Sequence, residues 1–158
     1  MIFRQLFDSS SSTYTYLIAD HNSREAVIID PVFEQTTRDL ALIRELDLKL
    51  VYTVDTHCHA DHVTGAWILK EKTGCQISAS KKIGAANVDI KLVHGDQIRF
   101  GDQYLGVRET PGHTDGCLTY VTHNQSHAFT GDALLIRGCG RSDFQQGNAN
   151  TLFDSIND

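Results

Sequence analysis

The chain has 158 residues, of which 41% are hydrophobic and 22% charged, an ordinary composition for a globular protein of one domain, residues 1–158. A formal net charge of -6 without a Lys/Arg cluster argues against a nucleic-acid partner. No apolar run approaches the length of a membrane span, and the N-terminus lacks the apolar core of a signal peptide. The four cysteines form no CxxC pair, which predicts free thiols in a reducing compartment. Cytoplasm is the default location, and a processed organelle protein is the alternative.

Hydrophobic patterning predicts strands first and then strands alternating with helices. The expected strands are Ile2–Phe7, Tyr14–Ala19, Ala26–Asp30, Leu50–Asp55, Gln76–Ala79, Ile98–Phe100, Tyr104–Glu109, Leu118–Thr122 and His127–Thr130. The expected helices are Thr36–Leu46, His62–Thr73 and Asn148–Ile156. We expect Asp61 to be the N-cap of the second helix and Trp67 to lie on its buried face. This order favours one compact α/β unit.

The segment from Thr56 to His62 concentrates metal-ligating side chains: three histidines and one aspartate within a few residues. Imidazole nitrogen and carboxylate oxygen suit zinc and non-haem iron. In an extended segment His57 and His59 point to the same side, while Cys58 points away. Asp61 and His62 follow and can face a neighbouring point. The alternative is a polar loop whose histidines merely cap the next helix.

Two further strand ends carry candidate ligands. His113 lies in Thr-Pro-Gly-His-Thr after one predicted strand, and Asp132 follows Thr-Gly after another. Ligands gather at the carboxyl ends of strands in α/β proteins. Together with the ligands of the 57–62 segment, these candidates are more than one metal ion requires. Either two metals bind, or some of the candidates support the ligands without binding metal. The other histidines (His21, His94, His123 and His127) are interpreted as structural or solvated, and Cys75 and Cys117 as small buried hydrophobes.

The pattern His-x-His-x-Asp-His, then a lone His after Pro-Gly, then Gly-Asp, resembles the metallo-β-lactamase superfamily. That resemblance implies an α/β fold, a four-layer αββα sandwich with the metal site at one edge of two sheets. The chain is more similar still to the persulfide dioxygenases. The similarity runs through residues 23–31, 56–65, 111–114 and 128–147, and the last stretch is the most specific because glyoxalase II continues differently.

The resemblance implies one Fe(II) per chain, held by His57, His113 and Asp132, with zinc as the alternative metal. Two histidines and one carboxylate leave an open face for substrate and O2. His59, Asp61 and His62, metal ligands in zinc hydrolases of the superfamily, would here surround that face as catalytic support. Arg141 stands where glyoxalase II has a basic residue for the glycine carboxylate of glutathione. Its alternative role is a surface salt bridge.

One departure from the family pattern is that its members continue with another strand, bearing a further histidine, and a C-terminal helical part. We therefore expect the chain to be C-terminally incomplete and unable to complete a two-zinc site alone.

The function implied by the resemblance is oxidation of glutathione persulfide by O2 and water to sulfite and glutathione. The main alternative is a hydroxyacylglutathione thiolester hydrolase of the glyoxalase II type, in which a metal generates hydroxide. A third reading is an inactive metal-binding domain. A homodimer is left open.

Overall fold

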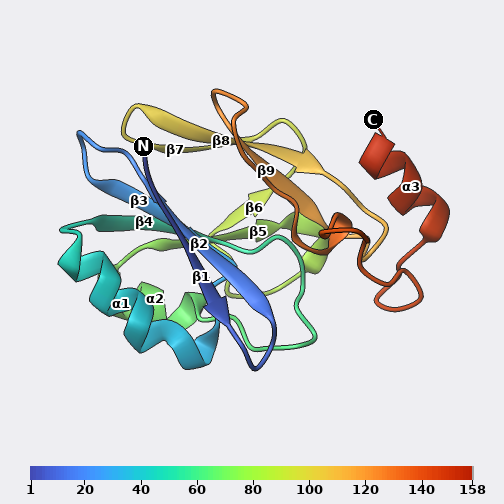
Figure 1. Cartoon of the computed structure of the whole chain (residues 1–158), viewed down its shortest axis with the longest axis horizontal. Helices are drawn as coiled ribbons and strands as arrows, with labels where there is room; N and C mark the ends of the chain where they lie inside the picture. Colours follow the sequence, from blue (N-terminus) through green and yellow to red (C-terminus); the bar gives the residue numbers. More distant parts are fainter. Residues whose placement is uncertain (158) are drawn as a thin grey trace.

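The computed structural model describes residues 1–157, whose elements form two β-sheets and three α-helices (Figure 1). The first sheet contains β1 (Ile2–Asp8), β2 (Thr13–Ala19), β3 (Glu25–Ile29), β4 (Lys49–Val54), β5 (Gln76–Ser80) and β6 (Ile90–Leu92), in that order. Strands β1 to β3 are antiparallel, whereas β3 to β6 are parallel. The parallel half brings the carboxyl ends of its strands to one edge, where the site lies.

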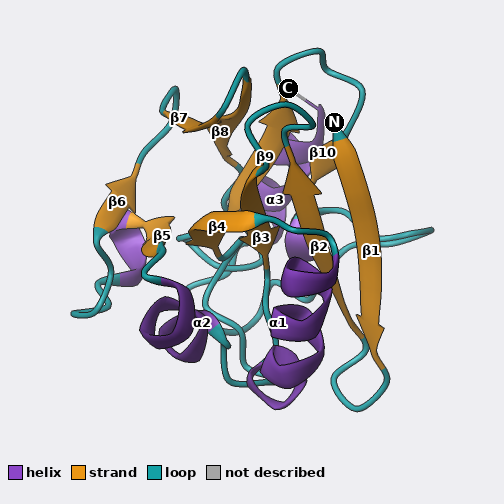
Figure 2. Ribbon diagram, turned by 90° about the vertical axis from the view of Figure 1, so that its left-hand side faces the viewer, coloured by secondary structure: helices purple, strands orange, loops and turns teal. Residues whose placement is uncertain are grey.

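Two crossover helices cover one face of this sheet. Helix α1 (Thr36–Glu45) connects β3 to β4, and α2 (Ala66–Thr73) connects β4 to β5. Figure 2 shows both on the same side of the strands. Ile43 and Leu69 pack there against the residues of the sheet that face the helices, including Ile28. The periodicity of residues 36–46 is thus confirmed as an amphipathic helix whose apolar stripe faces the sheet.

The second sheet is antiparallel, with the order β10-β9-β8-β7. Its strands are β7 (Gln97–Phe100), β8 (Gln103–Glu109), β9 (Leu118–Thr122) and β10 (Ala128–Phe129). The main hydrophobic core lies between the sheets. Ile29 and Val54 contribute from the first sheet, and Phe100, Leu105 and Tyr120 from the second. Burying alternate residues on both inner faces is the usual basis of sheet-on-sheet packing.

The α/β class and the two-sheet architecture are confirmed, and residues 1–157 build three of the four expected layers. Helix α3 (Ala149–Asn157) is the third helix. Figure 1 places it beyond one end of the sheets and not over the outer face of the β7–β10 sheet. Leu152 of α3 is buried, and the Ser155 hydroxyl donates to the Pro111 carbonyl. The helix therefore packs beside the turn that carries His113.

The predicted start of the second helix at His62 is wrong. Helix α2 begins at Ala66, and Gly65 is its N-cap. The Asp61 carboxylate is occupied instead by the Thr13 hydroxyl, and Thr64 bridges to Val32. These tertiary contacts hold the preceding residues as irregular loop, so the loop and not a helical turn presents His59, Asp61 and His62.

One smaller prediction also differs from the structure, and one strand was missed. Trp67 is 49% exposed, because Ala66 and Leu69 face the sheet and Trp67 points away from it. Strand β6 was not predicted, since three residues give too short a pattern to distinguish from a loop. The free thiols were predicted correctly: Cys75 and Cys117 are buried, and Cys58 and Cys139 are exposed.

Candidate metal centre

Three strand ends deliver the predicted ligands to one place. His57 follows β4, His113 follows β8, and Asp132 follows β10. Each of the three offers one ligand atom, and these atoms all lie within 4.8 Å of one another. The Nε2 atom of His113 is 3.6 Å from a carboxylate oxygen of Asp132. His57 is buried, whereas the Asp132 side chain is 43% exposed, so solvent reaches the trio from the Asp132 side.

Hydrogen bonds to the Nδ1 atoms orient both imidazoles. His113 Nδ1 lies 2.6 Å from the backbone carbonyl of Arg141, which only accepts, so this nitrogen carries the proton. His57 Nδ1 lies 3.0 Å from Thr56 Oγ1, and the Thr56 hydroxyl gives its own proton to Asp30. Thr56 therefore accepts from His57. In the neutral rings both Nε2 atoms keep a lone pair for a metal, as metal-binding histidines require.

Gly131 makes this close packing feasible. A Cβ atom at Gly131 would lie 2.3 Å from Thr56 Oγ1 and 3.3 Å from His57 Nδ1, and its φ of +49° is unfavourable for other residues. The glycine before Asp132 therefore allows the β10 end to approach the β4 end.

Electrostatics keep His57 neutral. Burial, followed by the charge of His59, lowers the pKa of His57 to about 3. A neutral imidazole binds a divalent cation without first losing a proton. The chemistry of the three donors, two imidazole nitrogens and one carboxylate, therefore fits a divalent transition metal.

Asp30, at the end of β3, organises the residues behind the ligands. It accepts hydrogen bonds from the backbone N–H and the hydroxyl of Thr56, and it lies 3.0 Å from His59 Nε2. Burial opposes its ionisation, but His59 and Thr56 outweigh burial and lower its pKa. Burial likewise disfavours charge on His59, yet Asp30 and Asp55 raise the pKa of His59 to about 9. Without a metal, the pair is an imidazolium and a carboxylate.

His59, Asp61 and His62 form a second group whose ligand atoms also lie within 4.8 Å of one another. His62 Nδ1 lies 3.3 Å from Asp61 Oδ2 and 3.3 Å from Thr13 Oγ1. Its Nε2 atom is buried and has no hydrogen-bond partner among residues 1–157. His62 and His59 line a mainly apolar cavity of about 430 Å³ with Cys58 and Trp67 on its wall.

The Arg141 side chain pairs with Asp143 on the surface. The side chain is 67% exposed, and its guanidinium makes two hydrogen bonds to the Asp143 carboxylate, at 2.8 and 3.0 Å. The contact of Arg141 with the centre is made by its backbone carbonyl, which accepts a hydrogen bond from His113 Nδ1. Binding of a substrate carboxylate by Arg141 stays a prediction.

Sequence reasoning missed four residues of the site. Asp30 comes directly after β3 and Asp55 directly after β4, much as Asp132 comes shortly after β10. Their position after a strand could therefore have identified them. Asp55 is buried, and burial raises its pKa to about 7, while the Thr64 hydroxyl donates to it. Thr56 and Thr13 carry no local signal of their roles.

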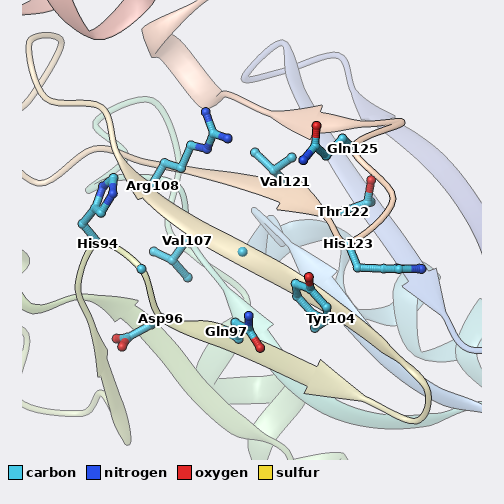
Figure 3. A pocket seen from close by; sticks show the side chains of 12 residues that line it. His94, Asp96, Gln97, Tyr104, Val107, Arg108, Val121, Thr122, His123 and Gln125 are labelled. Atoms are coloured by element: carbon cyan, nitrogen blue, oxygen red, sulfur yellow. The ribbon is translucent and has the colours of Figure 1, made fainter. Parts of the chain in front are cut away.

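A separate cavity of about 210 Å³ lies on the outer face of the second sheet (Figure 3). Tyr104 and Arg108 of β8 line it together with Val121 of β9 and His123 of the following turn. None of its lining residues belongs to either ligand group, so the cavity is distinct from the candidate centre.

The model of the metallo-beta-lactamase superfamily matches residues 10–158. The chain belongs to this superfamily. It is 55% identical to the mitochondrial persulfide dioxygenase ETHE1 of Mus musculus over 159 residues, covering 100% of this chain and 62% of that protein. The predicted similarity to persulfide dioxygenases is therefore confirmed.

A solved structure and a second kind of relative complete the comparison. The crystal structure of ETHE1 from Myxococcus xanthus superposes with a TM-score of 0.95 at 52% identity, covering 99% of this chain and 68% of that one. The hydroxyacylglutathione hydrolase GloC of Haemophilus influenzae is 33% identical, covering 85% of this chain and 73% of that protein. The chain thus resembles an oxygenase and, less strongly, a hydrolase. Within residues 1–157, every helix is too short or too polar to cross a membrane.

Proposed function

We propose that the chain carries the active centre of an iron(II)-dependent persulfide dioxygenase. The observation that carries the proposal is the convergence of one ring nitrogen each from two histidines and one carboxylate oxygen, each from a different strand end, with one ring Nδ1 held by a carbonyl and the other by a hydroxyl. Similarity to the persulfide dioxygenases of mouse and Myxococcus xanthus supports the same assignment. The chain spans 62% of the mouse protein, and the complete reaction is proposed on that basis.

In this proposal His57, His113 and Asp132 would hold one iron(II). When bound, iron(II) supplies the activation of O2 and the redox chemistry that a protein side chain lacks. Three protein ligands leave the remaining positions open for substrate and O2. Both atoms of O2 and one oxygen of water end on the terminal sulfur of glutathione persulfide, which leaves as sulfite, and glutathione is the second product.

The protein groups around the proposed ligands hold the ligating side chains in position. Thr56 and the Arg141 carbonyl fix which nitrogen of each ligating ring faces the metal. His59 stays fixed by Asp30 behind His57. Asp61 and His62 belong to the loop after His59, and His62 Nε2 has no hydrogen-bond partner among residues 1–157. In the proposal Arg141 would bind the glycine carboxylate of glutathione once it leaves Asp143.

A hydroxyacylglutathione hydrolase is the second candidate, and the group of His59, Asp61 and His62 favours it. This group could hold a second metal, and the similarity to GloC points the same way. A metal-binding domain without turnover is the third candidate. Cytoplasm remains our proposed location, although the mouse relative is mitochondrial by name. A homodimer is left open.

The deciding experiment combines metal analysis with two activity assays on one preparation. Oxygen uptake with glutathione persulfide, with about one iron per chain, supports the dioxygenase. Hydrolysis of a hydroxyacylglutathione thiolester with two zinc ions per chain supports the hydrolase. Bound metal with neither activity supports the third candidate.

A further inference from the structure

The hairpin between β1 and β2 reaches the loop that carries the second ligand group. Thr13, the first residue of β2, donates its hydroxyl proton to Asp61 Oδ2 at 3.1 Å, and its Oγ1 lies 3.3 Å from His62 Nδ1. Asp61 and His62 lie 48 and 49 positions after Thr13 in the sequence. The His62 side chain is only 2% exposed. A threonine far from the histidine cluster in sequence thus contacts a buried histidine directly.

The protons in this group can be assigned from the acceptors. The Asp61 carboxylate is an acceptor, because its Oδ2 atom receives the hydrogen bond from the Thr13 hydroxyl. Thr13 has given its proton to Asp61, so Thr13 Oγ1 can only accept from the ring. His62 Nδ1 therefore faces two acceptors and carries a proton. In the neutral ring this leaves the lone pair on Nε2.

That lone pair has no partner among the described residues. His62 Nε2 is fully buried and makes no hydrogen bond there, while the ring lines the cavity of about 430 Å³ beside His57 and His59. An unpaired buried polar atom is costly, so its orientation needs support from the other side of the ring. Thr13 and Asp61 are the groups that supply this support.

The Thr13 hydroxyl is itself held in place by the hairpin. Ser11 Oγ lies 2.8 Å from Thr13 Oγ1 and 2.8 Å from Asp8 Oδ2. The backbone N–H of Ser11 also donates to Asp8, and Gln35 donates to the other oxygen of this buried carboxylate. The hydroxyl therefore belongs to a fixed network and not to a mobile turn.

We propose that Thr13 is a positioning residue that holds Asp61 and His62 so that His62 Nε2 faces the reaction cavity as an acceptor. Its effect on turnover rests on the proposed dioxygenase function, whereas its effect on the ring of His62 does not. Thr13 holds Asp61 and His62 through its hydroxyl and not through its methyl group, so variants that keep only one of these groups distinguish positioning from packing.

The test compares Thr13→Val, which keeps the shape and removes the hydroxyl, with Thr13→Ser, which keeps the hydroxyl. Thr73→Val is the matched control, because Thr73 is also half-buried and donates only to the Leu69 carbonyl. We expect Thr13→Val to lower kcat for oxygen uptake about tenfold with KM changed less than about twofold, as for other groups that orient a metal site. Thr13→Ser should restore most of kcat, and Thr73→Val should leave it unchanged.

The second readout is the tautomer of His62, measured by ¹⁵N-edited NMR of protein loaded with one Zn(II) per chain and assigned with His62→Gln. The wild type should show a protonated Nδ1, and Thr13→Val should show a mixture of tautomers. An unchanged His62 spectrum in Thr13→Val overturns the proposal. So does a Thr13→Ser variant as impaired as Thr13→Val. If Thr13→Val does not fold, Ser11→Ala replaces it in the test, because it removes the side chain that supports the Thr13 hydroxyl. Ser11→Ala is expected to shift the His62 tautomer in the same direction. No shift in that variant overturns the proposal.

The two proposals fail in distinguishable ways. If iron-loaded wild type takes up no oxygen with glutathione persulfide, the dioxygenase proposal fails. The NMR comparison still decides the role of Thr13, since it needs no turnover.

Discussion

Asp30 Oδ1 and His59 Nε2 lie 3.0 Å apart with side chains that are each 7% exposed, so the centre contains a buried ion pair directly behind the residues that would hold the metal. Such a pair is maintained only while both partners stay charged and hydrogen-bonded. Asp30 satisfies its second oxygen through Thr56. The pair therefore makes the stability of the metal-free protein depend on pH.

The first prediction concerns that pH dependence. The pKa of His59 is raised to about 9 from 6.5, so the folded state holds a proton that the unfolded state loses between these values. The stabilisation is fully present below pH 6.5 and is lost as the pH rises towards 9, with an upper bound of about 3 kcal/mol. Chemical unfolding of chelator-treated wild type and His59→Gln should show a difference in free energy that shrinks over this window. A difference that grows with pH would contradict the assignment, and His123→Gln is the control.

The second prediction concerns the metal. Protein purified without added metal should contain about one iron per chain and little zinc, because two histidines and one carboxylate with an open face suit Fe(II). Metal content is measured by mass spectrometry against protein concentration. Two zinc ions per chain without iron would promote the hydrolase.

The third prediction separates the ligands from their neighbours. His57→Ala, His113→Ala and Asp132→Ala should each abolish iron retention. His59→Ala and His62→Ala should retain most of the iron and lose about 10–100-fold in activity, as residues that support metal ligands do. His123→Ala serves as the control. If His59→Ala empties the site as completely as His57→Ala, the division of roles is wrong.

The fourth prediction concerns Gly140. A Cβ atom there would lie 2.7 Å from His113 Nδ1 and 2.6 Å from the Asp132 backbone oxygen, closer than such atoms approach. Gly140→Ala should therefore displace two proposed ligands and reduce iron content about tenfold or more, by analogy with changes around metal ligands. Gly138→Ala is the matched control, because a Cβ there meets nothing within 4 Å. Equal iron in the two variants would show that the 138–140 segment adjusts freely.

The fifth prediction concerns Arg141 and Asp143. Since His113 uses the backbone carbonyl of Arg141, Arg141→Ala should leave iron content unchanged and raise the KM for glutathione persulfide about tenfold or more, the loss expected for a charge-assisted contact. Asp143→Asn should lower KM, because it removes the negative charge and one of the two acceptor oxygens that hold the guanidinium. Arg108→Ala is the control. An unchanged KM in both variants would show that Arg141 forms only a surface ion pair and does not bind substrate.

Local patterns predicted most of the strands and helices and the α/β class, and the family resemblance implied the two-sheet sandwich; long-range contacts account for what was missed. The alternation of residues 14–19 and the helical periodicity of residues 36–46 are local, and both elements form. The convergence of His57, His113 and Asp132 was predictable because each follows a strand. The irregular loop before Ala66 was not, since it depends on Thr13 and Val32, which are distant in sequence. No sequence pattern shows that Arg141 contributes a main-chain oxygen.

That main-chain oxygen has a consequence for substitutions at position 141. Every amino acid at position 141 presents a backbone carbonyl, so the support of His113 survives any substitution that leaves the loop in place. The side chain at the same position is exposed and pairs with Asp143, so a change there does not remove the backbone contact. One residue thus has two separable parts: its backbone oxygen orients the imidazole of His113, while its side chain can be exchanged without loss of that hydrogen bond.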